Sequence, residues 1–240
     1  MGYTLITGAT SDIGRQICRT LENSGHLLLL IDKDELALIE TVNELEYSKK
    51  HLYIQLDLSN TIDSISRLTD FIKCNDISIG YAVYAAGIFT IKPIKLIDYD
   101  FLKLNFNIAV FSAIMISQIL ASKKYNASNL KSIVFLSSIS ARIGTKGYVT
   151  YSAVKSSMIG AMKSMAIELS PRVRVNAVLP GGILTRATNF LRETMEDNPR
   201  YVLGCGDKAD VANLVDFLLS DKSRWITGQE FVVDGGLSSN

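Results

Sequence analysis

The chain has 240 residues, of which 48% are hydrophobic and 20% are charged, and its formal net charge is +1. These values predict one domain over residues 1–240 with a large core, and the nearly balanced charge gives no indication of nucleic acid or a membrane surface as a partner. The longest purely aliphatic run, Leu27 to Ile31, is far shorter than the roughly 20 residues that a membrane span needs.

The N-terminus carries no secretion-signal pattern, and the three cysteines are odd in number and form no Cys-x-x-Cys pair. Reduced thiols in a cytoplasmic protein are therefore expected. His26 and His51 have no cysteine or carboxylate at ligand spacing, so no metal site is predicted.

Short apolar runs alternate with longer helix-like segments along the whole chain. Strands are predicted near Tyr3–Thr7, Leu27–Ile31, Leu52–Leu56, Tyr81–Ala85, Ser132–Ser137, Val173–Val178 and Glu230–Val233. Helices are predicted near Ile13–Asn23, Glu35–Glu46, Ile62–Cys74, Tyr99–Ser122, Ser152–Leu169 and Lys208–Leu219. Strands that are apolar on both faces and separated by helices indicate a parallel sheet covered on both sides, so the fold class is a doubly wound α/β domain.

The segment from Pro180 to Asp207 breaks this alternation, because it is rich in glycine and has only a short helical pattern near Asn189–Met195. It follows the sixth predicted strand, at the carboxyl ends where open sheets bind ligands. A long irregular insert at this place predicts a substrate lid over residues 181–207, with a disordered surface loop as the alternative.

A glycine-rich sequence, TGATSDIG, runs from Thr7 to Gly14, directly after a predicted strand and directly before a helix. This context is typical of a dinucleotide-binding turn. Gly8 is expected to make a tight turn, Gly14 to let the helix pack closely on the sheet, and the helix N-terminus to face the pyrophosphate.

An acidic residue follows each of the next two strands. Asp32 lies eighteen residues after Gly14, where a carboxylate can accept hydrogen bonds from the adenine ribose and repels a 2′-phosphate. NAD(H) is therefore favoured over NADP(H), although Lys33 offers a phosphate partner. Asp57 and Leu58 are candidates to cover the adenine.

Tyr151 and Lys155 lie four residues apart, and Ser138 lies thirteen residues before the tyrosine. Side chains four apart project from one face of a helix. An ammonium near a phenol favours the phenolate, so this pair predicts a tyrosine that acts as an acid or a base near neutral pH.

Three further motifs follow in order: YAAG from Tyr84 to Gly87, PGGILT from Pro180 to Thr185 and ITGQEFVVDGG from Ile226 to Gly236. Together with the glycine-rich sequence and the Ser-Tyr-Lys set, they resemble the short-chain dehydrogenase/reductase family, in its short single-domain, ketoacyl-reductase-like branch. The resemblance covers nearly the whole chain. It implies a seven-stranded Rossmann sheet and reversible hydride transfer between a nicotinamide cofactor and an alcohol or ketone.

The resemblance also implies a role for each matched residue. Tyr151 would be the general acid/base at the substrate oxygen, Ser138 would hydrogen-bond that oxygen, and Lys155 would bind the nicotinamide ribose and lower the tyrosine pKa. Ser137 and Ser140 are rivals of Ser138 that only the spacing disfavours. The implied cofactor-binding residues are Gly8, Thr10, Ser11, Asp12, Ile13, Gly14, Asp32, Asp57, Leu58, Ala85, Ala86, Gly87, Tyr151, Lys155, Pro180, Gly181, Ile183 and Thr185.

The chain departs from the family pattern at three places. Asp12 replaces a glycine, and it either caps the helix that starts at Ile13 or weakens cofactor binding. Ala85 replaces an asparagine, which is a tolerated variant. The family's active-site asparagine falls at Ala109 here, so either a register shift lets Asn107 serve or the residue is absent, which would slow proton exchange with solvent; absence is favoured.

The stretch from Phe101 to Ala121 is apolar nearly all round, and a helix apolar on every face is expected to be buried on every face. The segment from Ser152 to Leu169 is also rich in methionine. We therefore expect a homodimer or homotetramer built on the helices near residues 99–122 and 152–169.

The leading hypothesis is an NAD(H)-dependent oxidoreductase that acts on a small alcohol or ketone. A non-catalytic dinucleotide-binding protein and an NADPH-dependent 3-oxoacyl-carrier reductase are the alternatives. The substrate and the direction of the reaction stay open at this point.

Overall fold

The computed structural model describes residues 2–127, 129–196 and 198–239. Its centre is one sheet of seven parallel strands in the order β3-β2-β1-β4-β5-β6-β7. The strands are β1 (Tyr3–Thr7), β2 (Leu28–Asp32), β3 (Leu52–Gln55), β4 (Ile79–Tyr84), β5 (Ser132–Leu136), β6 (Arg174–Pro180) and β7 (Glu230–Val233). The predicted fold class is therefore confirmed, and the predicted strands match these seven with small shifts at their ends.

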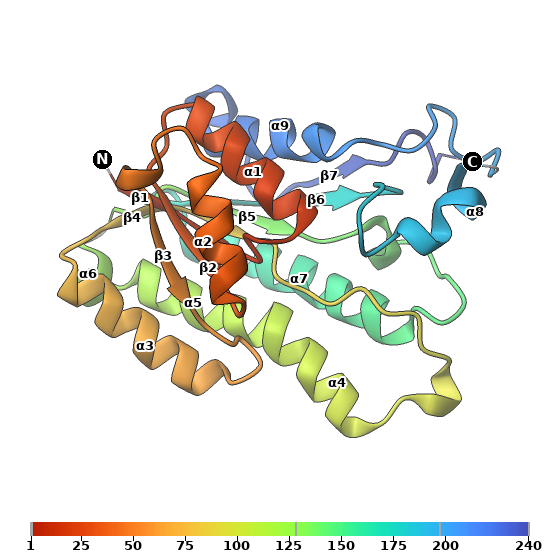
Figure 1. Ribbon diagram of the computed structural model, residues 1–240, viewed down its shortest axis with the longest axis horizontal. Coiled ribbons are helices and arrows are strands. Elements are labelled where there is room, and N and C mark those ends of the chain that lie inside the picture. The colour runs from red at the N-terminus through yellow and green to blue at the C-terminus, as the bar shows by residue number, and fades with distance from the viewer. Residues whose placement is uncertain (1, 128, 197, 240) are drawn as a thin grey trace.

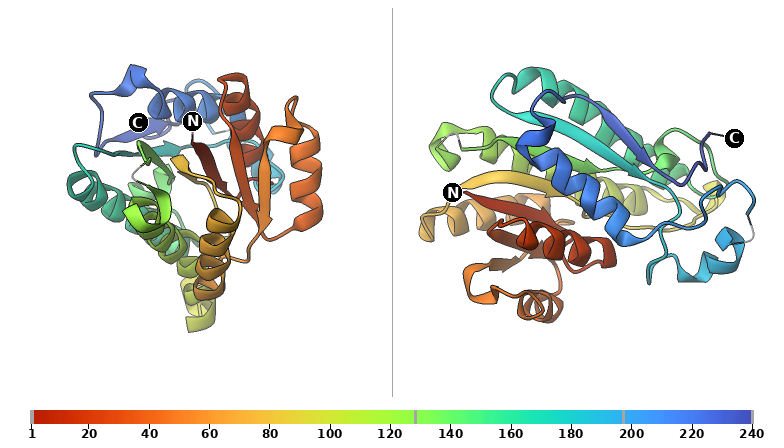
Figure 2. Two further views of the ribbon diagram at one scale, coloured as in Figure 1. Left: turned by 90° about the vertical axis from the view of Figure 1, so that its left-hand side faces the viewer. Right: turned by 90° about the horizontal axis from the view of Figure 1, so that it is seen from above.

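Helices cover both faces of the sheet (Figures 1 and 2). One face packs on α1 (Asp12–Asn23), α2 (Glu35–Asn43) and α9 (Lys208–Leu219). The other packs on α3 (Thr61–Cys74), α4 (Tyr99–Phe106), α5 (Ser112–Ala121) and α7 (Val149–Glu168). The short helices are α6 (Lys123–Asn126) and α8 (Arg192–Glu196), and 3-10 turns lie at Ser48–Lys50, Ile94–Leu96, Ile139–Ala141, Asn189–Leu191 and Asp221–Ser223.

The long helix predicted at Tyr99–Ser122 is not uniform. A π-helical turn at Asn107–Phe111 separates α4 from α5, so the residues after it are rotated relative to an unbroken α-helix. By length and composition the segment Tyr99–Ala121 could cross a membrane, but half of it is buried inside the domain, as in a core helix.

This helix is only partly covered within one chain. Its outer side exposes Phe111, at 48%, and Met115, at 39%, and this is the side that the expected partner subunit would cover. In α7, by contrast, Met158 and Met162 belong to the core of the same chain and are not free to form an interface. The methionine pattern there reflects packing on the sheet.

The sheet reverses its strand order between β1 and β4, because successive connections run to β2 on one side and to β4 on the other. Open parallel sheets bind ligands outside the carboxyl ends of the strands at such a switch point. The segment after β6 lies at this end, beyond the tips of β6 and β7 (Figure 1).

That segment, predicted as a lid, is folded onto the domain. Gly206 N donates to Gly182 O at 3.0 Å, which closes its base, and Met195 is buried at 7%. The 3-10 turn Asn189–Leu191 and α8 stand where the short helical pattern was predicted. The described residues of the segment thus fold onto the domain, and its role as a substrate lid stays a prediction.

Candidate active site

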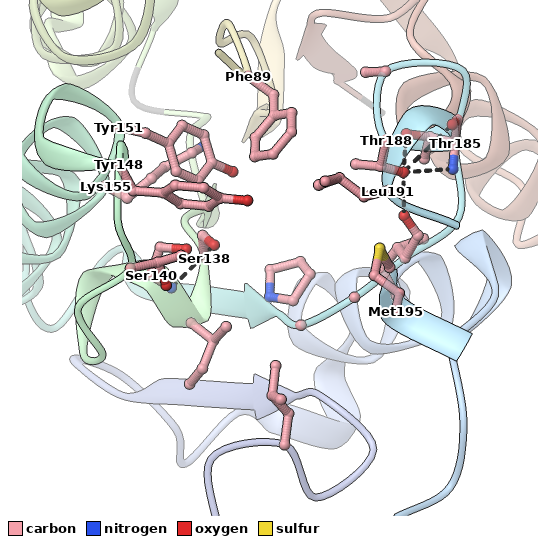
Figure 3. Close-up of a pocket in the computed structure, with 18 of the residues that line it drawn as sticks. Phe89, Ser138, Ser140, Tyr148, Tyr151, Lys155, Thr185, Thr188, Leu191 and Met195 are labelled. Carbon is pink, nitrogen blue, oxygen red and sulfur yellow. Dashed lines mark hydrogen bonds between the residues drawn. The ribbon is translucent and has the colours of Figure 1, made fainter. Parts of the chain in front are cut away.

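A cavity of about 770 Å³ opens at the carboxyl ends of β1, β4, β5 and β6 (Figure 3). It lies between the glycine-rich turn, the start of α7 and the segment 181–207. Among the predicted site residues, it is lined by Ser11, Asp12, Ile13, Ala85, Gly87, Ser138, Tyr151, Lys155, Pro180, Gly181, Ile183 and Thr185. Residues from five separate motifs of the sequence therefore converge on one cavity.

The glycine-rich turn has the close backbone approach that was predicted. Gly8 adopts φ +69°, and a Cβ there would lie 2.8 Å from backbone atoms of Ala86. Thr7 Oγ1 accepts a hydrogen bond from Ala86 N at 3.2 Å, which ties the ends of β1 and β4 together. A side chain at position 8 would therefore push the two strand ends apart, so the turn leaves a cradle that only glycine permits.

Helix α1 begins at Asp12, but Ser11 caps it: Ser11 Oγ accepts a hydrogen bond from Gly14 N at 3.0 Å. The prediction that Asp12 caps this helix is therefore wrong. The Asp12 carboxylate turns away from the helix and accepts hydrogen bonds from Arg186 of the segment after β6. A serine one residue earlier already satisfies the orphan N–H group, so the aspartate is free for a long-range partner.

Asp32 stands at the end of β2 and faces the turn. Its Oδ2 accepts hydrogen bonds from Thr10 N at 3.1 Å and from Thr10 Oγ1 at 2.7 Å, and its Oδ1 accepts from Lys33 N at 2.8 Å. These bonds hold a carboxylate beside the turn. Asp57 is exposed after β3, whereas the Leu58 side chain packs in the core, which leaves only its backbone for a ligand.

Three serines follow one another closely after β5, and the structure separates their roles. Ser137 Oγ donates to Lys155 O at 2.8 Å and so anchors α7. Ser138 Oγ accepts from Ser140 N at 3.2 Å and also lies beside the Tyr151 hydroxyl. The geometry favours Ser138 over Ser137, whose hydroxyl is engaged with the backbone of the helix.

Tyr151 and Lys155 lie one turn apart in α7, as predicted, with the ammonium 5.7 Å from the centre of the tyrosine ring. Lys155 Nζ donates to Leu136 O at 2.7 Å, at the end of β5. Burial lowers the pKa of Lys155 to about 8, and burial raises the pKa of Tyr151 to about 12, opposed by the Ser138 hydroxyl.

In the protein without cofactor, the ammonium of Lys155 is directed to the backbone carbonyl of Leu136, and desolvation raises the pKa of Tyr151. The lowering of this pKa by Lys155, which the family resemblance implies, stays a prediction. At neutral pH Tyr151 consequently holds its proton, which makes it a proton donor.

Sequence reasoning missed an aromatic wall that surrounds Tyr151 (Figure 3). The ring of Phe89 meets Tyr151 edge-on, with centroids 5.2 Å apart, and meets Tyr148 at 5.5 Å. Phe190, from the segment after β6, contacts Phe89 at 6.4 Å from the other side. Tyr148 lies one helical turn before Tyr151, and that spacing was the one signal available in the sequence.

Leu191 and Met195 of the segment 181–207 face this wall across the cavity (Figure 3). The side of the cavity away from the glycine-rich turn thus presents apolar side chains next to Ser138 and Tyr151, and its lining also includes polar residues such as Asn198 and Tyr201. Such a site can hold an apolar group next to an oxygen atom.

The helix asparagines lie elsewhere. Asn107 Nδ2 donates to Ser59 O at 2.7 Å, at the connection between β3 and α3, and Ala109 is buried at 2%. Asn105 Nδ2 donates to Phe101 O within its own helix. None of these three residues lines the cavity, and the loss of the relay asparagine stays a prediction.

Within residues 2–127, 129–196 and 198–239, no group of three or more His, Cys, Asp or Glu side chains could hold a metal ion. The chemistry that the described site offers is the polarisation of an oxygen atom and the donation of a proton to it.

Known proteins resemble the chain along its whole length. The family model described as enoyl-(acyl carrier protein) reductase matches residues 8–238. The 3-oxoacyl-[acyl-carrier-protein] reductase FabG of Rickettsia felis is 34% identical over 250 residues, which cover 98% of this chain and 95% of that protein. The (3R)-3-hydroxyacyl-CoA dehydrogenase of Rattus norvegicus is 30% identical over 245 residues, which cover 97% and 95%. The solved structure of 4-hydroxyisoleucine dehydrogenase complexed with NADH has a TM-score of 0.91 at 27% identity and covers 100% of both chains.

Proposed function

Because this chain belongs to the short-chain dehydrogenase/reductase family and is an oxidoreductase that uses a nicotinamide dinucleotide, we propose that it transfers hydride between NAD(H) and a small alcohol or ketone, with Tyr151 as general acid/base. The observation that carries this proposal is the meeting of Ser138, Tyr151 and Lys155 with the glycine-rich turn around one cavity. These groups come from β5, α7 and the β1–α1 connection, so their convergence is a property of the folded chain.

The residues of the turn fit a dinucleotide. The cradle at Gly8, which a Cβ would fill, lies at the N-terminus of α1, where backbone N–H groups and the helix dipole favour an anion. Ser11, Asp12 and Ile13 face the cavity from this helix start. When bound, the nicotinamide supplies or accepts the hydride.

The protein's own groups would act on the substrate oxygen. Ser138 orients the carbonyl oxygen by donating a hydrogen bond, and Tyr151, which burial keeps protonated, donates its proton to that oxygen during reduction. Lys155, whose ammonium lies at the end of β5 beside Leu136 O, would hold a hydroxyl of the nicotinamide ribose. In the opposite direction the same tyrosine removes the alcohol proton, which requires that its pKa fall when cofactor and substrate are bound.

The preference for NAD(H) over NADP(H) rests on Asp32. Its carboxylate is held beside the turn by Thr10 and by Lys33 N, where it can accept hydrogen bonds from ribose hydroxyls and would repel a 2′-phosphate. The likeness to 4-hydroxyisoleucine dehydrogenase, whose structure contains NADH, supports the same preference.

The second candidate is an NADPH-dependent 3-oxoacyl-carrier reductase, which the 34% identity to FabG of Rickettsia felis supports. Lys33 is exposed next to Asp32 and is the group that would meet a 2′-phosphate. The apolar wall around Phe89 suits an acyl chain as well as a small ketone.

A titration with NADH and with NADPH, followed by reduced-nicotinamide fluorescence, tests the proposal and separates the two candidates. Tighter binding of NADH, together with a gain in NADPH affinity for Asp32→Asn, is expected. Tighter binding of NADPH by the unchanged protein would instead favour the oxoacyl reductase. Failure to bind either dinucleotide would contradict both and leave a protein without this activity.

We further propose that residues 1–240 act as one catalytic domain, that residues 181–207 are the substrate lid, and that the chain works in the cytoplasm. A homodimer or homotetramer is proposed on the exposed apolar side chains of the two long helices, which include Leu104, Phe111, Ile114, Met115 and Val149. A monomer in light scattering at micromolar concentration would contradict the assembly.

A further inference from the structure

The start of α1 is joined to the lid by two residues that lie 174 positions apart in the sequence, Asp12 and Arg186. Arg186 N donates to Asp12 Oδ2 at 2.6 Å, and Arg186 Nε donates to Asp12 Oδ1 at 2.7 Å. Arg186 Nη2 also reaches Thr10 O, in the glycine-rich turn, at 3.3 Å. Three hydrogen bonds thus fasten one lid residue to the turn from which the dinucleotide would be held.

Both residues of the pair line the cavity, and their side chains differ in exposure. The Asp12 side chain is 17% exposed and the Arg186 side chain is 73% exposed. Burial would raise the pKa of Asp12, but the bonds and the charge of Arg186, with the charge of Lys208, outweigh it and lower the pKa below its usual value. Asp12 is therefore an anion at neutral pH, at the helix end where the pyrophosphate of a dinucleotide would lie.

The charges around the pair are mostly positive. A second cavity, of about 450 Å³, lies on the other side of the pair and is lined by Arg186, Arg192 and Lys208 together with Asp12. Of these cations, Arg186 and Lys208 act on the Asp12 carboxylate, whereas Arg192 is paired with Glu196. Without the Arg186 guanidinium, the Asp12 carboxylate would keep its bond from the backbone N–H of residue 186 but lose the neighbouring positive charge, and it would repel the dinucleotide phosphates.

We propose that Arg186 is a positioning residue that neutralises Asp12 and latches the lid to the glycine-rich turn, so that the pair replaces the uncharged glycine that the family resemblance leads one to expect at position 12. The latch keeps the lid over the cavity and keeps the carboxylate turned away from the dinucleotide. The inference rests on dinucleotide binding at this turn.

A double-mutant cycle measured by NADH titration tests the charge compensation. Arg186→Gln is expected to raise the Kd for NADH about tenfold, because the Asp12 carboxylate keeps its bond from the backbone N–H of residue 186 but loses the guanidinium charge that neutralises it. Asp12→Asn is expected to change the Kd less than about twofold, and the double variant is expected to recover most of the affinity. Arg192→Gln is the matched control, because it removes a lid cation whose ion pair, with Glu196, stays within the lid.

If the double variant bound NADH as weakly as Arg186→Gln, the effect of Arg186 would not depend on the Asp12 carboxylate, and the proposed charge compensation would be wrong. Equal losses in Arg192→Gln and Arg186→Gln would have the same consequence, because any lid cation would then serve.

Limited proteolysis of the protein without cofactor tests the latch by a readout other than affinity. Phe190, in the lid, is 67% exposed and is a chymotrypsin site. Arg186→Gln is expected to speed cleavage there several-fold, and Asp12→Asn by less, because the amide oxygen still accepts a hydrogen bond. Arg19→Gln breaks a 2.7 Å ion pair between α1 and Glu44, at the C-terminal end of α2, and is expected to leave the cleavage rate unchanged.

Unchanged cleavage in Arg186→Gln would show that the pair does not hold the lid. If the unaltered protein bound neither NADH nor NADPH, the proposed function would fail, while the cleavage rates would still decide whether the latch exists.

Discussion

The two halves of the cavity are built in different ways. The half around the glycine-rich turn is made mainly by backbone: two strand ends joined by the 3.2 Å hydrogen bond from Ala86 N to Thr7 Oγ1, a glycine at φ +69° and a capped helix start. The half around Tyr151 is made by side chains, since Phe89, Tyr148 and Leu191 line it from three separate connections. A backbone-built half suits a ligand of fixed shape, and a side-chain-built half lets the substrate differ without a change of fold.

Tyr151→Phe is expected to separate the two halves most clearly, because it should affect turnover and not cofactor binding. This change removes the proton donor and leaves the ring and its contact with Phe89, so kcat is expected to fall roughly 10²–10⁴-fold while the Kd for NADH stays nearly unchanged. Stopped-flow and steady-state measurements of NADH oxidation with a ketone substrate check this. Tyr148→Phe, in the same cavity, is the control and is expected to lose far less. Turnover equal to that of the unaltered enzyme in Tyr151→Phe would remove this tyrosine from the mechanism.

The backbone-built half is tested by Gly8→Ala. A Cβ at this position meets Ala86 backbone atoms at 2.8 Å, so the strand ends must separate and the Kd for NADH is expected to rise about a hundredfold. Gly25→Ala is the matched control, because Gly25 has φ +84° but no atom within 4 Å of an added Cβ. Both substitutions place an alanine at a positive φ and strain the backbone, but only Gly8→Ala also brings a Cβ against the backbone of Ala86. Similar NADH affinities in the two variants would show that the close approach is unimportant.

The sequence was most informative about the backbone-built half. The glycine spacing, the strand before it and the acidic residue at the end of β2 are local features, and local features can be recognised without knowing the fold. The seven strands were found for the same reason, because apolar runs of parallel strands differ clearly from helical patterns.

The remaining features of the site depend on contacts between distant segments. Asp12 and Arg186 lie 174 residues apart, so no spacing rule could pair them, and of the two readings that the sequence allows for Asp12 the helix cap is in fact provided by Ser11. The pKa of Lys155, about 8, follows from burial, which a sequence does not state. Phe89 meets Tyr151 only because the connection after β4 runs beside the start of α7: Lys92 N donates to Gly147 O at 2.9 Å.

At the C-terminal end of α1, away from the glycine-rich turn, lies a buried carboxylate that is expected to contribute to the stability of the fold. Glu22 accepts hydrogen bonds from Tyr47 N at 2.7 Å, from Glu46 N at 3.1 Å and from His51 Nε2 at 2.9 Å. The His51 Nδ1 atom in turn accepts from Leu28 N at 3.1 Å, which links α1 to β2. Burial would raise the pKa of Glu22, but these hydrogen bonds outweigh it and lower the pKa.

Glu22→Gln is expected to cost about 1–3 kcal/mol of unfolding free energy at neutral pH, because the amide turns a donor toward N–H groups. The folded pKa lies below the unfolded one, so the contribution of the charge is fully present above about pH 4.3 and is lost as the pH falls through the folded pKa. Urea unfolding at pH 7 and at pH 3.5 should therefore give a smaller difference between variant and parent at the lower pH. If the difference in unfolding free energy between Glu22→Gln and the unaltered protein instead grew at the lower pH, the pKa of Glu22 would be raised, not lowered, in the folded protein.

The smallest effect is expected from Phe89→Leu, and it tests whether the halves are separable at all. The phenyl ring meets Tyr151 at 5.2 Å and an interplanar angle of 88°, and an aromatic pair of this kind contributes roughly 0.5–1.5 kcal/mol beyond its buried area. Leucine keeps the site apolar but loses the edge-on contacts, so kcat/KM for a ketone is expected to fall about fivefold with the Kd for NADH unchanged. Phe190→Leu, at a ring that contacts Phe89 but not Tyr151, is expected to lose less. If Phe89→Leu weakened NADH binding as much as it weakened turnover, the aromatic wall would belong to the cofactor site as well, and the division between a backbone-built and a side-chain-built half would not hold.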